Sequence, residues 1–353
     1  MSASRHHIVA GLLFAFFGVL VPLLNYLGLV ADTTLNLWGR YFCFAIVALG
    51  MDLIWGFTGI LSLCQAFFFC LGGYAIGMHM LLKTGTKGVY GSTLPDFMVW
   101  NRVEELPLFW EPFHSLPLTL LLGLLVPGLA ALIFGFLAFR SRIKGVYLAI
   151  ITQALALAMW LLFLRNETML GGTNGLTDFK TLLGFELAEP ATKRGLYVAA
   201  CAALVGAYYL CRYIVGSKLG KLLVAIRDSE HRLRFIGYHI TRYKLFVFVV
   251  ASALAGLGGM LYVPQTGIIT PGRMDVQASI EIVVWTAVGG RGTLVGAIVG
   301  AVLVNLLYSF LTGAFPGTWL YFLGALFVGV VLFFPEGVAG IVGRLRRAYC
   351  IRR

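Results

Sequence analysis

Long apolar stretches that contain no charged residue alternate with short polar segments along this chain. A transmembrane helix needs roughly 20 largely apolar residues, because the hydrocarbon core of a bilayer is about 30 Å thick. Such stretches cover residues 8–31, 112–139, 145–164, 195–211, 245–272 and 292–335, and the last is long enough for two spans around a turn at 313–317. Residues 41–82 predict two further spans around the segment between Gly56 and Gly59, and residues 279–290 predict a broken one. The pattern predicts about ten spans in all.

The composition places the chain in lipid rather than in water. Hydrophobic residues make up 59% of it and charged residues 12%, whereas about a quarter of the residues in a soluble domain are charged. This balance excludes a soluble enzyme, a nucleic-acid-binding protein and a disordered chain. We therefore expect an all-α fold, a polytopic transmembrane helical bundle that forms one domain over residues 1–353. Broken helices are expected near Gly56 to Gly59 and near Gly289 to Gly292.

Lys and Arg are distributed unevenly over the loops. If ten spans start on the inside, eighteen of the 27 basic residues fall on one side of the membrane, together with three acids. An excess of Lys and Arg marks the cytoplasmic side. Both termini, the segment 216–244 and the basic tail 336–353 are then cytoplasmic, and the long loops 83–115 and 165–194 are external. The net charge of +12 therefore reflects topology and indicates no nucleic-acid partner.

Three further features concern processing and the external side. The first apolar run is too long for the core of a signal peptide and lacks a good cleavage site, which favours an uncleaved first helix. None of the six cysteines lies in a predicted external loop, so we expect no disulfide framework. The external loops are rich in turn-forming residues, and the sequence leaves open whether they receive a partner or only cover the bundle.

The sequence contains no motif that would bind a nucleotide, a metal or a cofactor. It has no G-x-x-x-x-G-K-[ST] loop for ATP phosphates and no H-E-x-x-H pair of metal ligands. It also lacks a combination of Ser and His typical of an intramembrane hydrolase. We therefore expect a protein that is not an enzyme and that takes its energy from another chain or from a gradient.

The cytoplasmic segment 216–244 predicts an amphipathic helix. Apolar residues fall near one helical face, and two acids each precede an arginine by four positions, which stabilises a helix in water. The apolar residues are Leu222, Ile226, Leu233 and Ile236, the charged pairs are Asp228 with Arg232 and Glu230 with Arg234, and Gly237 suits a helix end. Such a helix lies on anionic lipid, packs on its own bundle or docks to a soluble partner, and the pattern alone does not choose among these roles.

Two acids lie within predicted spans. A charge in the bilayer costs about 2.5–3.5 kcal/mol, so it usually faces the bundle interior or a water-filled path. Asp52 and Glu281 are each followed by a tryptophan, Trp55 and Trp285, and then by glycines, which indicates a weak repeat around a site near the midplane. Gln65 is a third candidate for lining a path. Each of these side chains could instead bridge helices or hold a broken backbone turn.

Glycines also recur at a helix-packing spacing. Gly292, Gly296 and Gly300 lie four residues apart, and small residues at this spacing let two membrane helices approach closely. We expect these glycines to serve helix packing rather than substrate choice.

Three stretches resemble the permeases of ABC importers in the branched-chain amino-acid family. They are residues 56–74, residues 288–300, and the run from Gly220 to Gly237, which resembles the cytoplasmic coupling segment of these permeases. The resemblance extends over most of the chain and implies a multi-pass transport subunit of a bacterial inner membrane, with no cofactor of its own. It also implies partners: a homologous second permease subunit, two ABC ATPase subunits, an external substrate-binding protein and the membrane lipid.

By this resemblance, the residues that meet an ATPase lie in the coupling segment. They are Gly220, Ala225, Arg227, Asp228, Glu230 and Gly237. The charged members would supply polar contacts, and the small members would let the two proteins approach closely.

Within the family, several segments look like the permease of a urea importer. They are residues 48–56, 95–99 with 105–107, 177–180, and 312–316 before Trp319. Amino-acid permeases of the family usually have Asn at the position of Asp52. The resemblance implies urea as the cargo, moved by alternating access along a pathway of Asp52, Trp55, Gln65, Glu281 and Trp285. The alternatives are a branched-chain amino acid (leucine, isoleucine or valine) in the same kind of importer, and a passive urea channel, in which the coupling segment would have no role.

Overall fold

The computed structural model describes residues 16–85, 91–103, 105–141 and 143–315, together with positions 317, 318, 321, 322, 324, 325, 328, 329, 337, 338 and 340. The start of the predicted first span, most of the second span of 292–335 and most of the basic tail 336–353 lie outside the described residues. The expected all-α membrane bundle is confirmed, because long apolar helices dominate the chain.

Seven helices are long and apolar enough to cross a membrane. They are α3 (Asp32–Thr58), α4 (Gln65–Thr84), α6 (Leu116–Arg140), α7 (Val146–Phe163), α8 (Pro190–Gly216), α10 (Ile240–Thr266) and α12 (Leu294–Ala314). Two shorter apolar helical segments are Phe16–Tyr26, which contains α2 (Val21–Tyr26), and α11 (Val276–Gly289). With its 14 residues, α11 is shorter than a full span. The total of ten spans stays a prediction.

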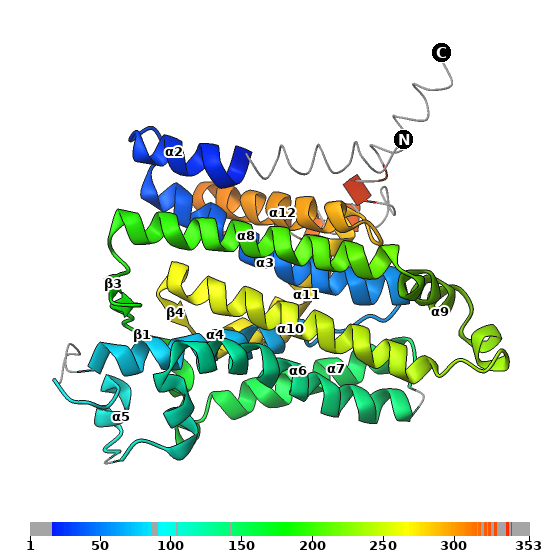
Figure 1. Ribbon diagram of the computed structural model, residues 1–353, viewed down its shortest axis with the longest axis horizontal. Helices are drawn as coiled ribbons and strands as arrows, with labels where there is room; N and C mark the ends of the chain where they lie inside the picture. The colour runs from blue at the N-terminus through cyan, green and yellow to red at the C-terminus, as the bar shows by residue number, and fades with distance from the viewer. Residues whose placement is uncertain are drawn as a thin grey trace.

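The long helices run side by side along the long axis of the molecule (Figure 1). At one end lie α5 (Asp96–Trp100) and two small antiparallel sheets, and we call this the strand end. There, β1 (Leu176–Thr177) pairs with β4 (Ile268–Ile269), and β2 (Thr181–Leu182) pairs with β3 (Phe185–Glu186). The opposite end, which we call the α9 end, is formed by α9 (Lys218–Phe235) between α8 and α10. The basic segment and the two long loops therefore lie at opposite ends of the bundle.

The centre of the bundle consists of α3, α4 and α10. The buried share of the most apolar stretch is 89% in α3 and 94% in α4, but only 28% in α6 and in α7. Large apolar side chains such as Leu121, Ile133 and Leu161 are exposed on the outer helices. In a membrane these outer faces contact lipid or another membrane subunit, so the exposed apolar side chains do not face water.

Both helix breaks lie where the sequence predicts them. The helix α3 ends at Thr58, and Gly59 follows in the left-handed conformation with φ 73°. The helix α11 ends at Gly289, and the loop 290–293 before α12 contains Gly292 with φ 79°. Residues with a Cβ rarely adopt this conformation, which explains why glycine stands at the two breaks.

Backbone contacts at glycines bring α11 and α12 together. A Cβ on Gly300 would lie 2.6 Å from the Cα of Gly289, and a Cβ on Gly296 would lie 2.6 Å from the Gly289 carbonyl oxygen. These three residues therefore form one close contact between the helices. Gly292 lies outside it, because its position in the loop before α12 brings it near Gly56 of α3.

We predict that Gly300→Leu destabilises the bundle by about 3 kcal/mol or more, because a larger side chain forces the two backbones apart. The control is Gly313→Leu in the same helix, since a Cβ there meets nothing within 4 Å. Thermal unfolding of the purified chain in detergent measures the effect. Equal stability of the two variants would contradict the packing role.

Candidate functional site

Three segments that are distant in the sequence meet near the α9 end. The Asp52 carboxylate of α3 accepts a hydrogen bond from the Gly292 backbone N–H, with 2.6 Å between Oδ1 and N. One turn later in α3, the Gly56 carbonyl oxygen accepts a hydrogen bond from Arg227 of α9, at 2.8 Å from Nη1. We call Asp52, Gly56, Arg227 and Gly292 the junction. It ties the end of α3 to the loop 290–293 and to α9.

Glycine makes the close approach at the junction possible. A Cβ on Gly56 would lie 2.5 Å from the Gly292 nitrogen and 2.8 Å from its Cα. The Gly59 backbone lies against the stem of Arg227, where a Cβ would lie 3.0 Å from Cγ. Backbone therefore contacts backbone or side-chain stem here, and any larger residue would separate the three segments.

The tryptophan that follows Asp52 also belongs to this region. The Arg291 guanidinium lies over the Trp55 ring, with 5.2 Å between its Cζ and the ring centroid. A cation over an indole face is favourable, so this contact adds a second link between α3 and the loop 290–293. Asp52 and Trp55 of α3 therefore both contact the loop 290–293, where the second helix break lies.

The other residues of the predicted pathway lie elsewhere on α4 and α11. Gln65 begins α4 and is 1% exposed, and no described residue forms a hydrogen bond with its amide group. Glu281 is half-buried and accepts a hydrogen bond at 3.5 Å from Gln277 of its own helix. Trp285 is buried against Phe44 of α3, with 4.9 Å between ring centroids. Their place along a substrate pathway stays a prediction.

The helix α9 differs from its predicted form at its centre. Ser229 has φ −157° and ψ 87°, which is not helical, so the helix consists of two parts with a kink between them. The first part buries Leu223 and Ile226, whereas Ile236, predicted on the same apolar face, is 72% exposed. That prediction is wrong, because the kink breaks the 3.6-residue period on which a continuous face depends.

The kink also decides which charged pairs form. Glu230 pairs with Arg234 at 2.7 Å, as predicted for positions i and i+4. Asp228 lies before the kink and pairs with its neighbour Arg227 at 3.1 Å. The predicted pair of Asp228 with Arg232 is not present among the ion pairs of the described chain, because helical geometry does not continue from one residue to the other.

Glu230 is the centre of a larger ion cluster. Its Oε2 lies 3.0 Å from Nζ of Lys144, in the turn between α6 and α7, and 3.0 Å from Nζ of Lys244 in α10. Burial alone would raise the pKa of the Glu230 carboxyl, but the hydrogen bonds from Lys244 and Lys144 outweigh it and hold that pKa below its usual value. The carboxylate is therefore charged at neutral pH. We call Glu230, Arg234, Lys144 and Lys244 the Glu230 cluster.

The end of α9 has the predicted glycine stop. Gly237 has φ 91°, its N–H donates to the Arg234 carbonyl at 3.0 Å, and the next N–H, of Tyr238, donates to the Leu233 carbonyl at 3.1 Å. These two bonds form a Schellman motif, which satisfies carbonyl groups left free at a helix end. The turn between α9 and α10 is therefore well defined.

The residues predicted to meet an ATPase occupy different environments. Gly220 is buried against the Val215 carbonyl, and Arg227 and Glu230 bind groups of their own chain. Ala225 is half-buried, and Asp228 and Gly237 are exposed. The Arg227 and Glu230 contacts were not foreseen, since no sequence period relates Arg227 to Gly56, 171 positions away.

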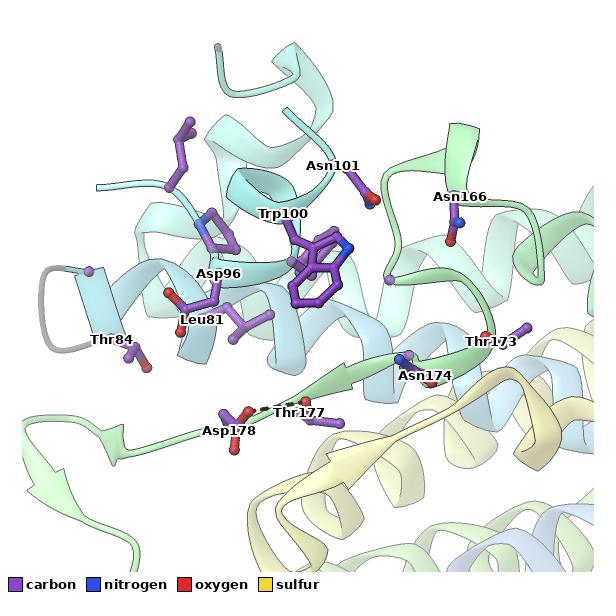
Figure 2. A pocket seen from close by; sticks show the side chains of 16 residues that line it. Leu81, Thr84, Asp96, Trp100, Asn101, Asn166, Thr173, Asn174, Thr177 and Asp178 are labelled. Atoms are coloured by element: carbon purple, nitrogen blue, oxygen red, sulfur yellow. Dashed lines mark hydrogen bonds between the residues drawn. The ribbon is translucent and has the colours of Figure 1, made fainter. Parts of the chain in front are cut away.

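At the strand end, a pocket of about 420 Å³ opens between the two long loops. Figure 2 shows the Trp100 indole in its middle, with Asp96, Asn101, Asn174 and Asp178 around it. Segments 95–99 and 177–180, which resemble the permease of a urea importer, therefore both line this cavity. Sequence reasoning noted the segments but not that they meet. Among the described residues, no group of three or more His, Cys, Asp or Glu side chains could hold a metal ion.

These features define a class of protein. A multi-pass helical bundle with two broken helices that meet beside a polar helix is the architecture of a membrane transport subunit. Residues 33–331 match the family described as the permease component of the branched-chain amino acid transport system, and the chain belongs to this family. It is therefore an inner-membrane transport subunit and not an enzyme.

Several similar proteins are permeases for different cargoes. The high-affinity branched-chain amino acid transport system permease protein LivM of Salmonella typhimurium is 26% identical over 317 residues, covering 84% of this chain and 67% of LivM. A probable LivM of Methanocaldococcus jannaschii is 23% identical over 327 residues, covering 86% and 91%. The autoinducer 2 import system permease protein LsrC of Enterobacter sp. is 27% identical over 241 residues, covering 67% and 66%. No solved structure matches the chain significantly.

We predict that Asp52→Leu destabilises the chain by about 1–3 kcal/mol, because the half-buried Gly292 N–H loses its acceptor. The matched control is Asp52→Asn, whose amide oxygen still accepts this bond, and it should lose less than half as much. Unfolding of both variants in detergent measures the difference. If both were as stable as the wild-type chain, the junction would have no structural role.

Proposed function

We propose that this chain is the membrane-spanning subunit of an ATP-driven ABC importer and that its cargo is urea. Family membership supports the transport role, and the absence of a P-loop from the sequence assigns ATP hydrolysis to separate chains. The observation that carries the choice of urea is Asp52, a fully buried acid of α3, at the position where amino-acid permeases that resemble this chain usually have Asn.

The chemistry of urea suits the polar atoms buried in the bundle. Urea is flat and neutral, with four N–H donors and one carbonyl acceptor. Asp52 Oδ2, both amide atoms of Gln65 and the Ser279 hydroxyl are buried and form no hydrogen bond within the described chain. Asp52, Gln65 and Ser279 thus offer acceptors for the N–H groups of urea, and Gln65 and Ser279 also offer donors for its carbonyl. Leucine is a zwitterion, so a path for it must also hold a carboxylate, for which buried Asp52 and half-buried Glu281 are poor neighbours.

The junction supports a mechanism of alternating access. In this proposal, closure of the ATPases pushes on the segment 216–244, and α9 passes the displacement to the end of α3 through Arg227. Asp52 then moves the loop 290–293 with α3, because its carboxylate holds the Gly292 N–H. A path near Asp52, Gln65 and Glu281 opens to one side and closes to the other.

The partners follow from the same proposal. A homologous second permease subunit would cover part of the exposed apolar outer surface, two ABC ATPase subunits would bind at the α9 end, and an external substrate-binding protein would bind at the strand end. The pocket between the external loops supports the last of these placements, since it lies opposite α9.

Branched-chain amino-acid transport is the second candidate for the cargo. The observation that favours it is the set of relatives, because the LivM proteins of Salmonella typhimurium and Methanocaldococcus jannaschii are named as permeases of such systems. A passive urea channel would account for the buried polar groups but would leave the contacts of α9 with the junction without a role.

We predict that cells lacking only this chain regain uptake of labelled urea when the chain is restored. Excess leucine should leave this uptake unchanged, and depletion of ATP should abolish it. Restored entry of leucine without urea would show that the cargo is an amino acid. Urea uptake that survives ATP depletion would indicate a channel and would contradict the importer.

A further inference from the structure

A second cavity, of about 710 Å³, lies between α8 and the start of α12, near the α9 end. Both helices pack against α3 but have little direct contact with each other, and Phe57 of α3 also lines the space between them (Figure 1). We call this space the α8–α12 cavity. Its two walls include Tyr208, Arg212 and Val215 of α8 and Leu294, Val295 and Val299 of α12. Its volume is within the range of about 300–1,000 Å³ that is typical of ligand sites.

The wall formed by α8 presents a positive charge. Among the described residues that line the cavity, Arg212 alone is charged, and it is half-buried. Its Nη1 donates a long hydrogen bond of 3.5 Å to the Tyr208 hydroxyl, which is neutral. Within the described ranges of the chain, no acid forms an ion pair with Arg212. Because a charge that is partly removed from water is costly unless an opposite charge is near, this guanidinium favours a bound anion.

The wall formed by α12 presents an apolar stripe. Val295 and Val299 line the cavity, and Leu303 follows one turn later on the same face of the helix. All three side chains are exposed. The stripe therefore leads from the cavity into the middle of the membrane span. A charged group at one end of an apolar stripe matches the headgroup and the acyl chains of a lipid.

The position of the cavity favours an anionic phospholipid. The distribution of Lys and Arg predicts that the α9 end faces the cytoplasm, where anionic lipids gather and where basic pockets between membrane helices bind their headgroups. A soluble anion would pair with Arg212 but would leave the apolar stripe uncovered. An apolar helix of another subunit would cover the stripe but would leave Arg212 without a counter-charge.

We propose that the α8–α12 cavity binds an anionic phospholipid, with the phosphate at Arg212 and the acyl chains along Val295, Val299 and Leu303. Gly292 also lines the cavity, and its N–H is the group that Asp52 holds in the junction. The bound lipid therefore lies against the loop 290–293 and ties it to α8. This inference concerns the lipid that surrounds the chain and is independent of the cargo.

The test is equilibrium binding of labelled phosphatidylglycerol to the full-length chain, purified in detergent and stripped of lipid. We expect saturable binding that phosphatidylcholine displaces at least about tenfold less effectively than unlabelled phosphatidylglycerol does. Arg212→Gln should weaken binding about fivefold or more, because one charged contact is lost. The matched control is Arg232→Gln, which removes the same charge from an exposed residue of α9 that does not line the cavity, and it should leave binding unchanged.

A second variant tests the apolar half of the site without changing any charge. Val299→Trp should weaken the binding of phosphatidylglycerol, because the larger side chain occupies the space of an acyl chain. Its control is Val126→Trp, a similarly exposed valine on the outer face of α6. The unfolding temperature of each lipid-free variant shows whether it folds. Phosphatidylglycerol should raise that temperature for the wild-type chain and less for Arg212→Gln, since a ligand stabilises the state that binds it.

Equal displacement by phosphatidylcholine would show that the site does not distinguish charge and would overturn the proposal. Displacement by inorganic phosphate alone would indicate a soluble anion instead of a lipid. Unchanged binding in both Arg212→Gln and Val299→Trp would show that the lipid binds elsewhere. Binding that disappears when a second permease subunit co-purifies would show that this face is a subunit interface. A failure of urea transport would change none of these binding results.

Discussion

The arrangement of the molecule depends on one constraint, which is that two interrupted helices must share their backbone polar groups. Where α3 and α11 stop, N–H and carbonyl groups lose their helical partners, and in a bundle surrounded by lipid each needs another. Asp52 supplies the acceptor for the Gly292 N–H, and Arg227 supplies a donor for the Gly56 carbonyl. The Arg227 guanidinium is a charged donor, which forms a stronger hydrogen bond than a neutral one. A requirement of the backbone therefore joins α9 to the bundle.

The same constraint explains why glycines and charged residues occur together in this chain. Glycine at the breaks permits both the left-handed conformation and the close approach of the segments, and the charged side chains then fill the polar contacts that the approach creates. Because these contacts serve the backbone, they suit a permease of any cargo. The atoms that would distinguish cargoes are polar atoms that these contacts leave free, namely Asp52 Oδ2, the amide atoms of Gln65 and the Ser279 hydroxyl.

Much of the fold could be predicted from local pattern. Apolar length located the spans, glycine located both helix breaks, and the stop at Gly237 and the pair of Glu230 with Arg234 follow from helix rules. The kink at Ser229 could not be predicted, since nothing in its neighbouring residues marks it. For the same reason, the sequence did not predict that Ile236 is exposed or that Asp228 pairs with Arg227. The junction was equally hidden, because its contacts join residues 171 and 240 positions apart and depend on packing, which no period in the sequence encodes.

We infer that Arg227, through the Gly56 carbonyl, links α9 to the end of α3 and so to the proposed transport path. The most direct measurement is the number of cargo molecules moved per ATP hydrolysed by the reconstituted importer with Arg227→Met, which keeps an apolar stem and removes the guanidinium. We expect that the ATPases still bind and hydrolyse ATP at a rate within about twofold of wild type, while transport per ATP falls on the order of tenfold. An unchanged ratio of transport to hydrolysis would show that Arg227 does not couple α9 to transport.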